Sequence, residues 1–277
     1  MSVRPRIAAI GLAGNTVFMG VPHFHSGGET VHALDFHGEF GGKGFNQAVA
    51  AARQGAETYF LTAIGEDDAA RLDGFLRSEG VYGTIVVKKT PSAHATILTD
   101  GTGETRVTVF PGASLEADDV DAFAGKIASA DFLLLNNEVP EDVNLRAAAI
   151  AKEHGVAIVF NPAPARPLPE ALRVGVRLFT PNEFEEAALG DVPGEVVTTL
   201  GAAGCRIRSS GMVVPAANCG VPVDSTGAGD TFTAVLSVRL AEGESMESSC
   251  RAANEAAGRS VTVRYVLPSI PHRTLVR

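Results

Sequence analysis

The segment Val221-Pro222-Val223-Asp224-Ser225-Thr226-Gly227-Ala228-Gly229-Asp230 joins a short apolar run to a long helical stretch. A glycine-rich turn between a strand and a helix leaves the backbone N–H groups of residues 227–229 without helical partners. Such amides attract phosphate, and glycine lets the backbone approach the phosphate oxygens closely. Asp230 would then lie beside a bound phosphate, where it can accept a proton from an attacking hydroxyl. The alternative is an ordinary helix start capped by Asp224 or Thr226.

Composition limits the partners of this chain. Its 277 residues, 45% of them hydrophobic, suit one large α/β domain. With 23 Lys and Arg against 32 Asp and Glu, the formal charge is −9, so no broad positive field is available for nucleic acid or an anionic membrane. No apolar run approaches the roughly 20 residues that span a bilayer. We therefore expect a cytoplasmic protein that binds neither nucleic acid nor membrane.

Short apolar runs alternate with amphipathic, alanine-rich segments along most of the chain. This pattern is typical of β-α-β units wound into a mostly parallel sheet. The expected strands are 7–11, 58–64, 131–136, 157–160, 178–180 and 196–200. The expected helices are 44–54, 67–78, 117–128, 141–154, 183–189, about 228–241 and 247–261.

Two regions interrupt this alternation. Residues 30–40 and 82–110 have the pattern of extended strands, with Asp100-Gly101-Thr102-Gly103-Glu104 as a hairpin turn. Strands inserted into an α/β chain predict a small sheet over the site, because excluding water favours phosphate transfer over hydrolysis. The alternative is a structural extension of the sheet edge. Exposed strands of such a lid could also pair between subunits and form a homodimer.

Four further stretches carry a family resemblance. They are Gly41-Gly42-Lys43-Gly44-Phe45-Asn46-Gln47-Ala48, Asn161-Pro162-Ala163-Pro164-Ala165-Arg166, Thr180-Pro181-Asn182-Glu183-Phe184-Glu185 and Thr199-Leu200-Gly201. Together with the turn before Asp230, and in this order, they resemble the ribokinase family, also called the PfkB carbohydrate kinases. The resemblance extends over nearly the whole chain. It implies a single domain over 1–277, a three-layer α/β sandwich with a mostly parallel central sheet, and a small β-sheet lid with strands from about 14–40 and 82–111.

The resemblance also implies an activity. Such kinases use ATP to phosphorylate a hydroxyl on a small sugar or sugar-like acceptor. By this resemblance Asp230 would be the general base, and the amides of Gly227, Ala228 and Gly229 would stabilise the charge on the transferring phosphate. A nucleoside kinase of the same family is the alternative acceptor class. A catalytically inactive protein that binds a metabolite is the alternative of another class.

On the acceptor side, the resemblance implies binding by Gly42, Lys43, Asn46 and Glu138, with Thr16 nearby. Carboxylate and amide groups at strand ends suit recognition of adjacent hydroxyls. The segment around Lys43 lacks the spacing of a P-loop, so we assign this lysine no catalytic role.

On the nucleotide side, the resemblance implies Asn182, Thr199, Gly201 and Asn254. Asn182 and Glu185 are three residues apart at a helix start, so they face the same way and could orient Mg²⁺ through water. The alternative is an asparagine cap followed by a solvated glutamate. Asn254 could instead be an amide on a helix surface.

The chain departs from the family on the acceptor side. Ribokinases follow their first strand with Gly-x-x-Asn-x-Asp, but this chain has Gly11, Gly14 and Thr16 at the three defined positions. A threonine hydroxyl cannot make the bidentate contact of a carboxylate, so ribose itself is in doubt. His94 and Thr96, which alternate on a strand of the expected lid, are candidates to face the acceptor.

Two other departures concern the nucleotide side. Tyr265 stands where the family has a glycine, in a loop that helps to form a monovalent-cation site with Asp224, so a K⁺ requirement is left open. The segment between Glu186 and Val196 is also shorter than the family's helical segment, which could shorten the wall behind the nucleotide.

Overall fold

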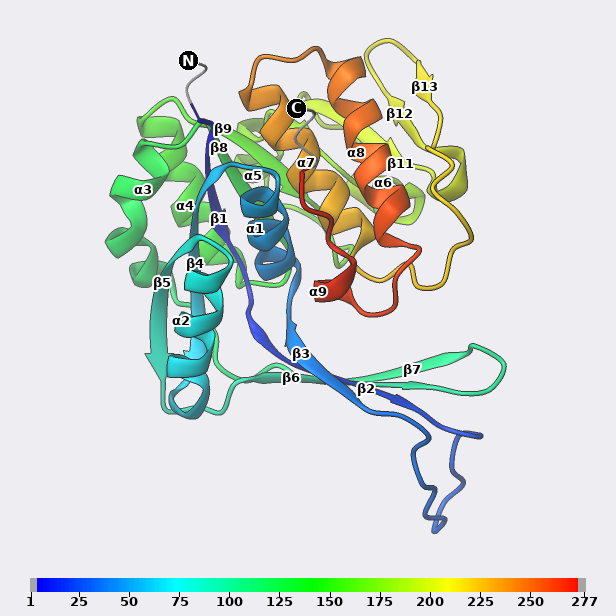
Figure 1. The fold of residues 1–277 in the computed structure, drawn as a ribbon. Coiled ribbons are helices and arrows are strands. Elements are labelled where there is room, and N and C mark those ends of the chain that lie inside the picture. The colour runs from blue at the N-terminus through cyan, green and yellow to red at the C-terminus, as the bar shows by residue number, and fades with distance from the viewer. Residues whose placement is uncertain (1–3, 274–277) are drawn as a thin grey trace.

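The computed structural model describes residues 4–273 and places helices on both sides of a nine-stranded sheet (Figure 1). The strand order is β13-β12-β11-β10-β9-β8-β1-β4-β5. All neighbouring strands from β11 to β5 are parallel, and β12 and β13 add an antiparallel edge. The strands are β1 Arg6–Ile10, β4 Glu57–Gly65, β5 Val81–Lys88, β8 Phe132–Asn136, β9 Ala157–Asn161, β10 Leu178–Phe179, β11 Glu195–Thr199, β12 Cys205–Ile207 and β13 Val213–Val214.

The structure has a helix at each expected place, with most ends shifted by one or two residues, and two further short helices, at 170–175 and 266–269, that the sequence pattern did not indicate. The helices are α1 Lys43–Arg53, α2 Ala69–Ser78, α3 Ala124–Ala128, α4 Glu141–Glu153, α5 Glu170–Gly175, α6 Glu183–Leu189, α7 Ala228–Ala241, α8 Met246–Ser260 and α9 Val266–Ser269. Two segments expected to be wholly helical begin with 3-10 turns, η1 Glu66–Asp68 and η2 Ala117–Phe123, where aspartates, poor helix formers, are frequent. A third 3-10 turn, η3, spans Gly201–Ala203. None of the helices between residues 4 and 273 is long and apolar enough to cross a membrane.

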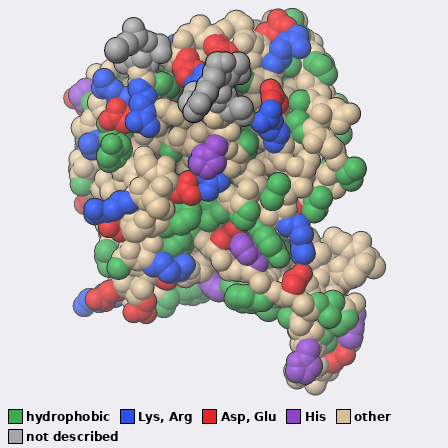
Figure 2. Space-filling view, viewed as in Figure 1, with side chains coloured by type: hydrophobic (Ala, Val, Ile, Leu, Met, Phe, Trp, Pro, Cys, Tyr) green, Lys and Arg blue, Asp and Glu red, His purple; other side chains and the backbone are tan. Residues whose placement is uncertain are grey.

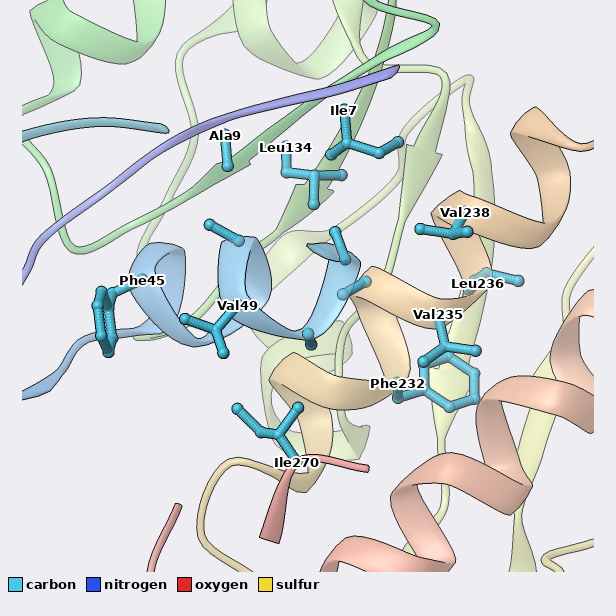
Figure 3. Packing of buried hydrophobic residues seen from close by; sticks show 14 of the residues in the cluster. Ile7, Ala9, Phe45, Val49, Leu134, Phe232, Val235, Leu236, Val238 and Ile270 are labelled. Atoms are coloured by element: carbon cyan, nitrogen blue, oxygen red, sulfur yellow. The ribbon is translucent and has the colours of Figure 1, made fainter. Parts of the chain in front are cut away.

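Side chains of the parallel strands are buried on both faces of the large sheet. In β1, Ile7 and Ala9 join the core under α1, α2, α7 and α8, whereas the alternate residues of the strand join the core under α3 to α6. Figure 3 shows α1, which carries Phe45 and Val49, next to α7, which carries Phe232 and Val235, below Ile7, Ala9 and Leu134 of the strands. This packing sets α1 and α7 side by side.

The order of the strands reverses at β1. From β1 the chain continues to β4 and β5 on one side, and it later adds β8, β9, β10 and β11 on the other side. In an open parallel sheet, such a reversal leaves a crevice beyond the carboxyl ends of the strands, and ligands bind there. The α/β sandwich expected from the sequence is therefore confirmed, with its crevice located at β1 and β8.

A second, four-stranded sheet projects from the body of the molecule (Figures 1 and 2). Its order is β3-β2-β6-β7, formed by β2 Gly14–Gly20, β3 His37–Gly41, β6 Ala93–Thr99 and β7 Thr105–Phe110. The hairpin turn at 100–104 is confirmed, since the Asp100 amide donates to the Glu104 carbonyl oxygen at 3.0 Å.

Two expectations about this small sheet are wrong. Residues 82–88 are not part of it, because β5 pairs in parallel with β4 along eight positions and closes the edge of the large sheet. Residues 30–36 form no strand, and β3 begins only at His37. β5 instead becomes the edge strand of the large sheet, and this depends on long-range pairing that the extended pattern alone could not reveal.

The pairing register also decides which side chains share a face. Thr16 lies opposite Ala95, and Phe18 lies opposite Ile97. Side chains alternate between the faces of a strand, so His94 and Thr96 point to the face opposite Thr16 and Phe18. His94 and Thr96 therefore lie on a different face of the small sheet from the other acceptor-side candidate, Thr16.

Candidate active site

The glycine turn before α7 forms as the sequence predicts. Gly227 is the N-cap of the helix and has a φ of 77°, a left-handed conformation that favours glycine. A Cβ at this position would lie 2.5 Å from Cγ1 of Val266, so the close packing also requires glycine. Asp224 caps the turn, since its Oδ1 accepts the Thr226 amide at 2.9 Å. The Ala228 amide already donates to the Ser225 carbonyl oxygen at 3.2 Å, unlike the unpaired amide expected there.

A cavity of about 230 Å³ opens at this turn. It brings together seven residues singled out in the sequence: Lys43, Asn182, Glu185, Thr199, Gly227, Gly229 and Asp230. Thr180 and Ser225 complete part of its wall. Residues separated by nearly two hundred positions in the chain therefore meet at one polar cavity.

The Asp230 carboxylate is buried at one side of this cavity, with 5% of the residue exposed. The Asn46 side-chain amide donates to its Oδ2 at 2.9 Å, and the Gln47 amide donates to its Oδ1 at 3.2 Å. Burial raises the pKa of Asp230, while the positive charge of Lys43 and the two amide donors oppose that rise. The result is a fixed carboxylate with increased basicity.

Glu138 and Lys43 connect the end of β8 to the start of α1. The Lys43 backbone amide donates to Glu138 Oε2 at 2.6 Å, so this carboxylate satisfies one of the free amides of the helix start. Burial raises the pKa of Glu138 to about 7, against the opposing charge of Lys43. The pKa of Lys43 is itself raised, chiefly by the charge of Asp230. The positive charge of Lys43 therefore compensates two carboxyl groups.

The start of α1 also positions Thr16. Gly42, the N-cap, has a φ of 125°, and a Cβ there would lie 2.3 Å from the Leu12 carbonyl oxygen. A Cβ on Gly41 would lie 2.4 Å from the Thr16 Oγ1. The Thr16 hydroxyl thus lies against the glycine pair that leads into the site.

Asn182 and Glu185 cap α6 reciprocally. Asn182 Oδ1 accepts the Glu185 amide at 2.8 Å, and Glu185 Oε2 accepts the Asn182 amide at 2.9 Å. The capping alternative is therefore confirmed, yet both residues also line the cavity. The Glu185 carboxylate lines the same cavity as Gly227 and Gly229, so it would suit a Mg²⁺ ion that keeps several of its waters.

The remaining expected nucleotide-side residues are placed differently. Thr199 lines the cavity and lies beside Asn182 at the end of β11. Gly201 is exposed at the start of η3, and Asn254 is buried in α8. The Asn254 side-chain amide donates to the carbonyl oxygens of Val214 and Pro215 at 2.9 and 3.0 Å, so it orders the segment after β13. The alternative of a surface amide is wrong for Asn254.

Asp224 connects the glycine turn to the loop before α9. Asp224 Oδ2 accepts the Tyr265 amide at 3.0 Å, while Oδ1 accepts the Thr226 amide. Both carboxylate oxygens are thus engaged by backbone N–H groups. Tyr265 itself adopts a φ of 69°.

Sequence reasoning did not single out Gln47. It is fully buried in α1, and it holds Asp230 together with Asn46. A signal was present, because Gln47 follows Asn46 directly in the glycine-led motif and is a polar residue in a helix otherwise rich in alanine.

Comparisons with known proteins identify the family of this chain. The pfkB family carbohydrate kinase domain matches residues 4–273. The ribokinase of Bacillus subtilis is 36% identical over 253 residues, covering 84% of this chain and 85% of that protein. The ribokinase of Haemophilus influenzae is 31% identical over 296 residues, covering 98% and 97%.

Solved structures share the fold. The ribokinase of Thermotoga maritima has a TM-score of 0.86 at 30% identity, covering 98% of this chain and 97% of that one. Arabidopsis thaliana ribokinase, solved with ribose and ATP, has a TM-score of 0.86 at 27% identity, covering 97% and 96%. A nucleoside kinase from Burkholderia thailandensis shares the fold at 18% identity, with a TM-score of 0.79 over 97% and 94% of the two chains. The domain match along almost all of the sequence, together with relatives above 30% identity, shows that this ATP-dependent carbohydrate kinase belongs to the pfkB family.

Proposed function

We propose that this kinase transfers the γ-phosphate of ATP to a hydroxyl of a small sugar or sugar-like acceptor, with Asp230 as the general base. The observation that carries the proposal is the fixed, buried Asp230 carboxylate immediately after the glycine turn. The carboxylate takes the proton of the acceptor hydroxyl as its oxygen attacks the phosphorus and ADP leaves.

The glycine turn supplies electrostatic stabilisation in this proposal. The amides of Gly227 and Gly229 line the cavity, and they bind the oxygens of the transferring phosphate. The Ala228 amide contributes only if it leaves the Ser225 carbonyl oxygen. The Lys43 side chain adds a positive charge at the same cavity, while its backbone amide holds Glu138 on the acceptor side.

On the nucleotide side, Asn182 and Thr199 line the phosphate end of the cavity. Gly201 and Asn254 do not line this cavity, so in this proposal they act on the nucleotide beyond its phosphates, Asn254 by ordering the segment after β13. Glu185, with Asn182, would hold Mg²⁺ through water, and that ion would neutralise phosphate charge when bound. Each Asp224 oxygen accepts one backbone amide and keeps a further lone pair, so this carboxylate would be the group to hold a K⁺ ion.

The acceptor binds between Gly42, Asn46, Glu138 and Thr16 in this proposal. Within the described chain, Asn46 Oδ1 is buried without a hydrogen-bond partner, so it is available to an acceptor hydroxyl. The ribose bound by the Arabidopsis relative makes pentoses the first class to test. Thr16 supplies one hydroxyl contact where a carboxylate would supply two.

A nucleoside acceptor is the second candidate. A larger cavity of about 380 Å³ lies between the small sheet and the loop before the glycine turn, and Ser225 belongs to both cavities. Its lining includes Phe18, Ile97 and Tyr265, which offer apolar surface to a base attached to the sugar.

We also propose that the chain acts as one unit in the cytoplasm, where ATP is available, with the small sheet as a lid. Val107 and Val109 on its edge strand β7 are 57% and 63% exposed, so two copies could pair through this edge. Sedimentation velocity tests this homodimer, which Val109→Lys should dissociate. A monomeric wild-type protein would contradict it.

The proposed activity is tested by incubating the protein with ATP, Mg²⁺ and a panel of pentoses, hexoses and nucleosides. Phosphorylated products are identified by mass spectrometry, and ADP release is followed in parallel. A phosphorylated sugar, formed by the wild type and not by Asp230→Asn, supports the proposal. A nucleoside monophosphate as the preferred product supports the second candidate, and ADP release that no acceptor stimulates contradicts both.

A further inference from the structure

The Glu39 carboxylate is buried where the small sheet meets α9. Glu39 is 8% exposed, its Oε1 accepts the Val266 amide at 2.9 Å, and its Oε2 accepts the Leu267 amide at 3.3 Å. His37 Nε2 lies 3.0 Å from Oε2. A buried carboxylate is unfavourable unless it is fully partnered, so Glu39 and the start of α9 hold each other in place.

The start of α9 in turn supports the glycine turn. Val266 packs directly on Gly227, where a Cβ would lie 2.5 Å from the valine Cγ1. The preceding residue, Tyr265, donates its amide to Asp224, which also caps Thr226. Movement of this loop would therefore move the amides that face the phosphate.

The loop does not hold this conformation by itself. Tyr265 has a left-handed φ of 69°, which is unfavourable for a residue with a side chain. Its ring stacks on His37 with centroids 3.9 Å apart and an interplanar angle of 12°, and Phe18 lies 5.3 Å away. Contacts from the small sheet therefore keep Tyr265 in place.

Glu39 is also close in sequence to the other half of the site. It precedes Gly41 by two residues on β3, and the chain then enters α1. The start of α1 carries Asn46 and Gln47, which hold Asp230. Glu39 thus links two parts of the site. One is β3, which leads to Asn46 and Gln47, and the other is the loop before α9, which supports the glycine turn.

We propose that Glu39 is a positioning residue for phosphoryl transfer. It acts through Val266 and Gly227, and it fixes the glycine turn relative to Asp230. This inference rests on the proposed function of that turn. Because transfer depends on alignment to a fraction of an ångström, loosening this link should lower the rate more than it lowers binding.

The test compares Glu39→Ala, Glu39→Gln and the control Arg264→Gln. Arg264 also joins this loop to the segment before β3, through an ion pair with Asp35 at 3.2 Å, but the pair is largely exposed. With the acceptor that the wild type phosphorylates, Glu39→Ala should lower kcat roughly 10- to 100-fold with little change in either KM. Glu39→Gln keeps one acceptor oxygen and should recover part of the loss, while Arg264→Gln should retain wild-type kcat.

Thermal unfolding separates positioning from stability. A lower Tm for Glu39→Ala, with wild-type kcat well below that temperature, would mean that Glu39 is only structural and would overturn the inference. If Glu39→Ala does not fold, Glu39→Gln and Glu39→Asp are used in its place. Wild-type kcat in both of these variants would also overturn the inference.

Hydrogen exchange gives a readout that needs no turnover. Amides of residues 224–229 and 265–267 should exchange faster in Glu39→Ala, or in Glu39→Gln if the alanine variant does not fold, than in Arg264→Gln. Unchanged exchange at 224–229 would overturn the coupling. If the wild type phosphorylates no acceptor, the proposed function fails, and this exchange comparison still decides whether Glu39 holds the turn.

Discussion

The Asp230 carboxylate combines unfavourable burial with three compensating partners. Desolvation raises its pKa, and Lys43, Asn46 and Gln47 stabilise its ionised form. A base is most effective when its pKa approaches the working pH, so this balance suits proton transfer from an alcohol. The amide donors also fix which carboxylate oxygens are engaged and thus the direction in which Asp230 can act.

Ionisation of Glu138 should make kcat/KM for the acceptor depend on pH. Burial raises its pKa to about 7 from an ordinary 4.5. The ionised form accepts hydrogen bonds at both oxygens, whereas protonation turns one oxygen into a donor. We expect kcat/KM for the acceptor to rise with pH through about 7 and Glu138→Gln to flatten that rise.

The same shift has an opposite effect on stability. Because folding raises the pKa of Glu138, its contribution to stability is present below about pH 4.5 and is lost as pH rises through about 7. Wild-type Tm should therefore fall relative to Glu138→Gln over this range. If kcat/KM for the acceptor depended on pH in the same way in the wild type and in Glu138→Gln, Glu138 would be excluded as the titrating group.

Thr16 should limit pentose recognition. Thr16→Asp adds a carboxylate beside Gly41, and one additional charged hydrogen bond of roughly 1.5 kcal/mol corresponds to about a tenfold gain in kcat/KM for pentoses. Thr16→Val, which removes the hydroxyl, is the matched control and should lower the value. No gain with aspartate would indicate a pocket rebuilt for another acceptor.

Within the glycine turn, two glycines have different physical roles. A Cβ at Gly229 meets nothing within 4 Å, and this residue lines the cavity. Gly229→Ala should fold with an equal or higher Tm, because alanine favours helix, yet raise the KM for ATP about tenfold by obstructing phosphate, the equivalent of roughly 1.5 kcal/mol.

Gly227→Ala is the comparison. There the left-handed φ and the contact with Val266 should cost about 1–3 kcal/mol of stability and lower Tm. Calorimetry together with ATP kinetics distinguishes the two variants. Equal losses of Tm would contradict the difference in their roles.

Elements defined by strong periodicity were predictable, and those defined by pairing were not. The helices at 141–154, 183–189 and 228–241 and the central strands follow from local pattern. The position of β5 in the large sheet does not follow from local pattern, because an extended segment has the same sequence pattern in a small sheet and at the edge of a large one. The face of His94 likewise depends on the pairing of β6 with β2.

At the scale of the whole molecule, the site is assembled from distant segments of the chain. The strand reversal at β1 brings α1, the end of β8 and the start of α7 to one edge of the sheet. The glycine-rich turn indicated Asp230 because close backbone approach has a local signature, whereas Asn46 and Glu138 followed only from the family resemblance. Long-range partners such as Glu39 have no such signature, since their role depends on which loop packs against them.

The small sheet and the body enclose the larger cavity between them. The loop before α9 contacts both parts, through Glu39 on one side and Gly227 on the other. Acceptor binding against the small sheet could thereby influence the anion-binding amides, which connects recognition of the acceptor to transfer.

The most direct test of the central claim is the rate of phosphoryl transfer by Asp230→Asn, measured beside its affinity for ATP. Asp73→Asn, which alters a partly exposed carboxylate on α2, is the control. We expect Asp230→Asn to bind ATP much as the wild type does and to lower kcat by about 10²- to 10⁴-fold, as the loss of a positioned base should. Wild-type kcat in Asp230→Asn would contradict the assignment of Asp230 as the base.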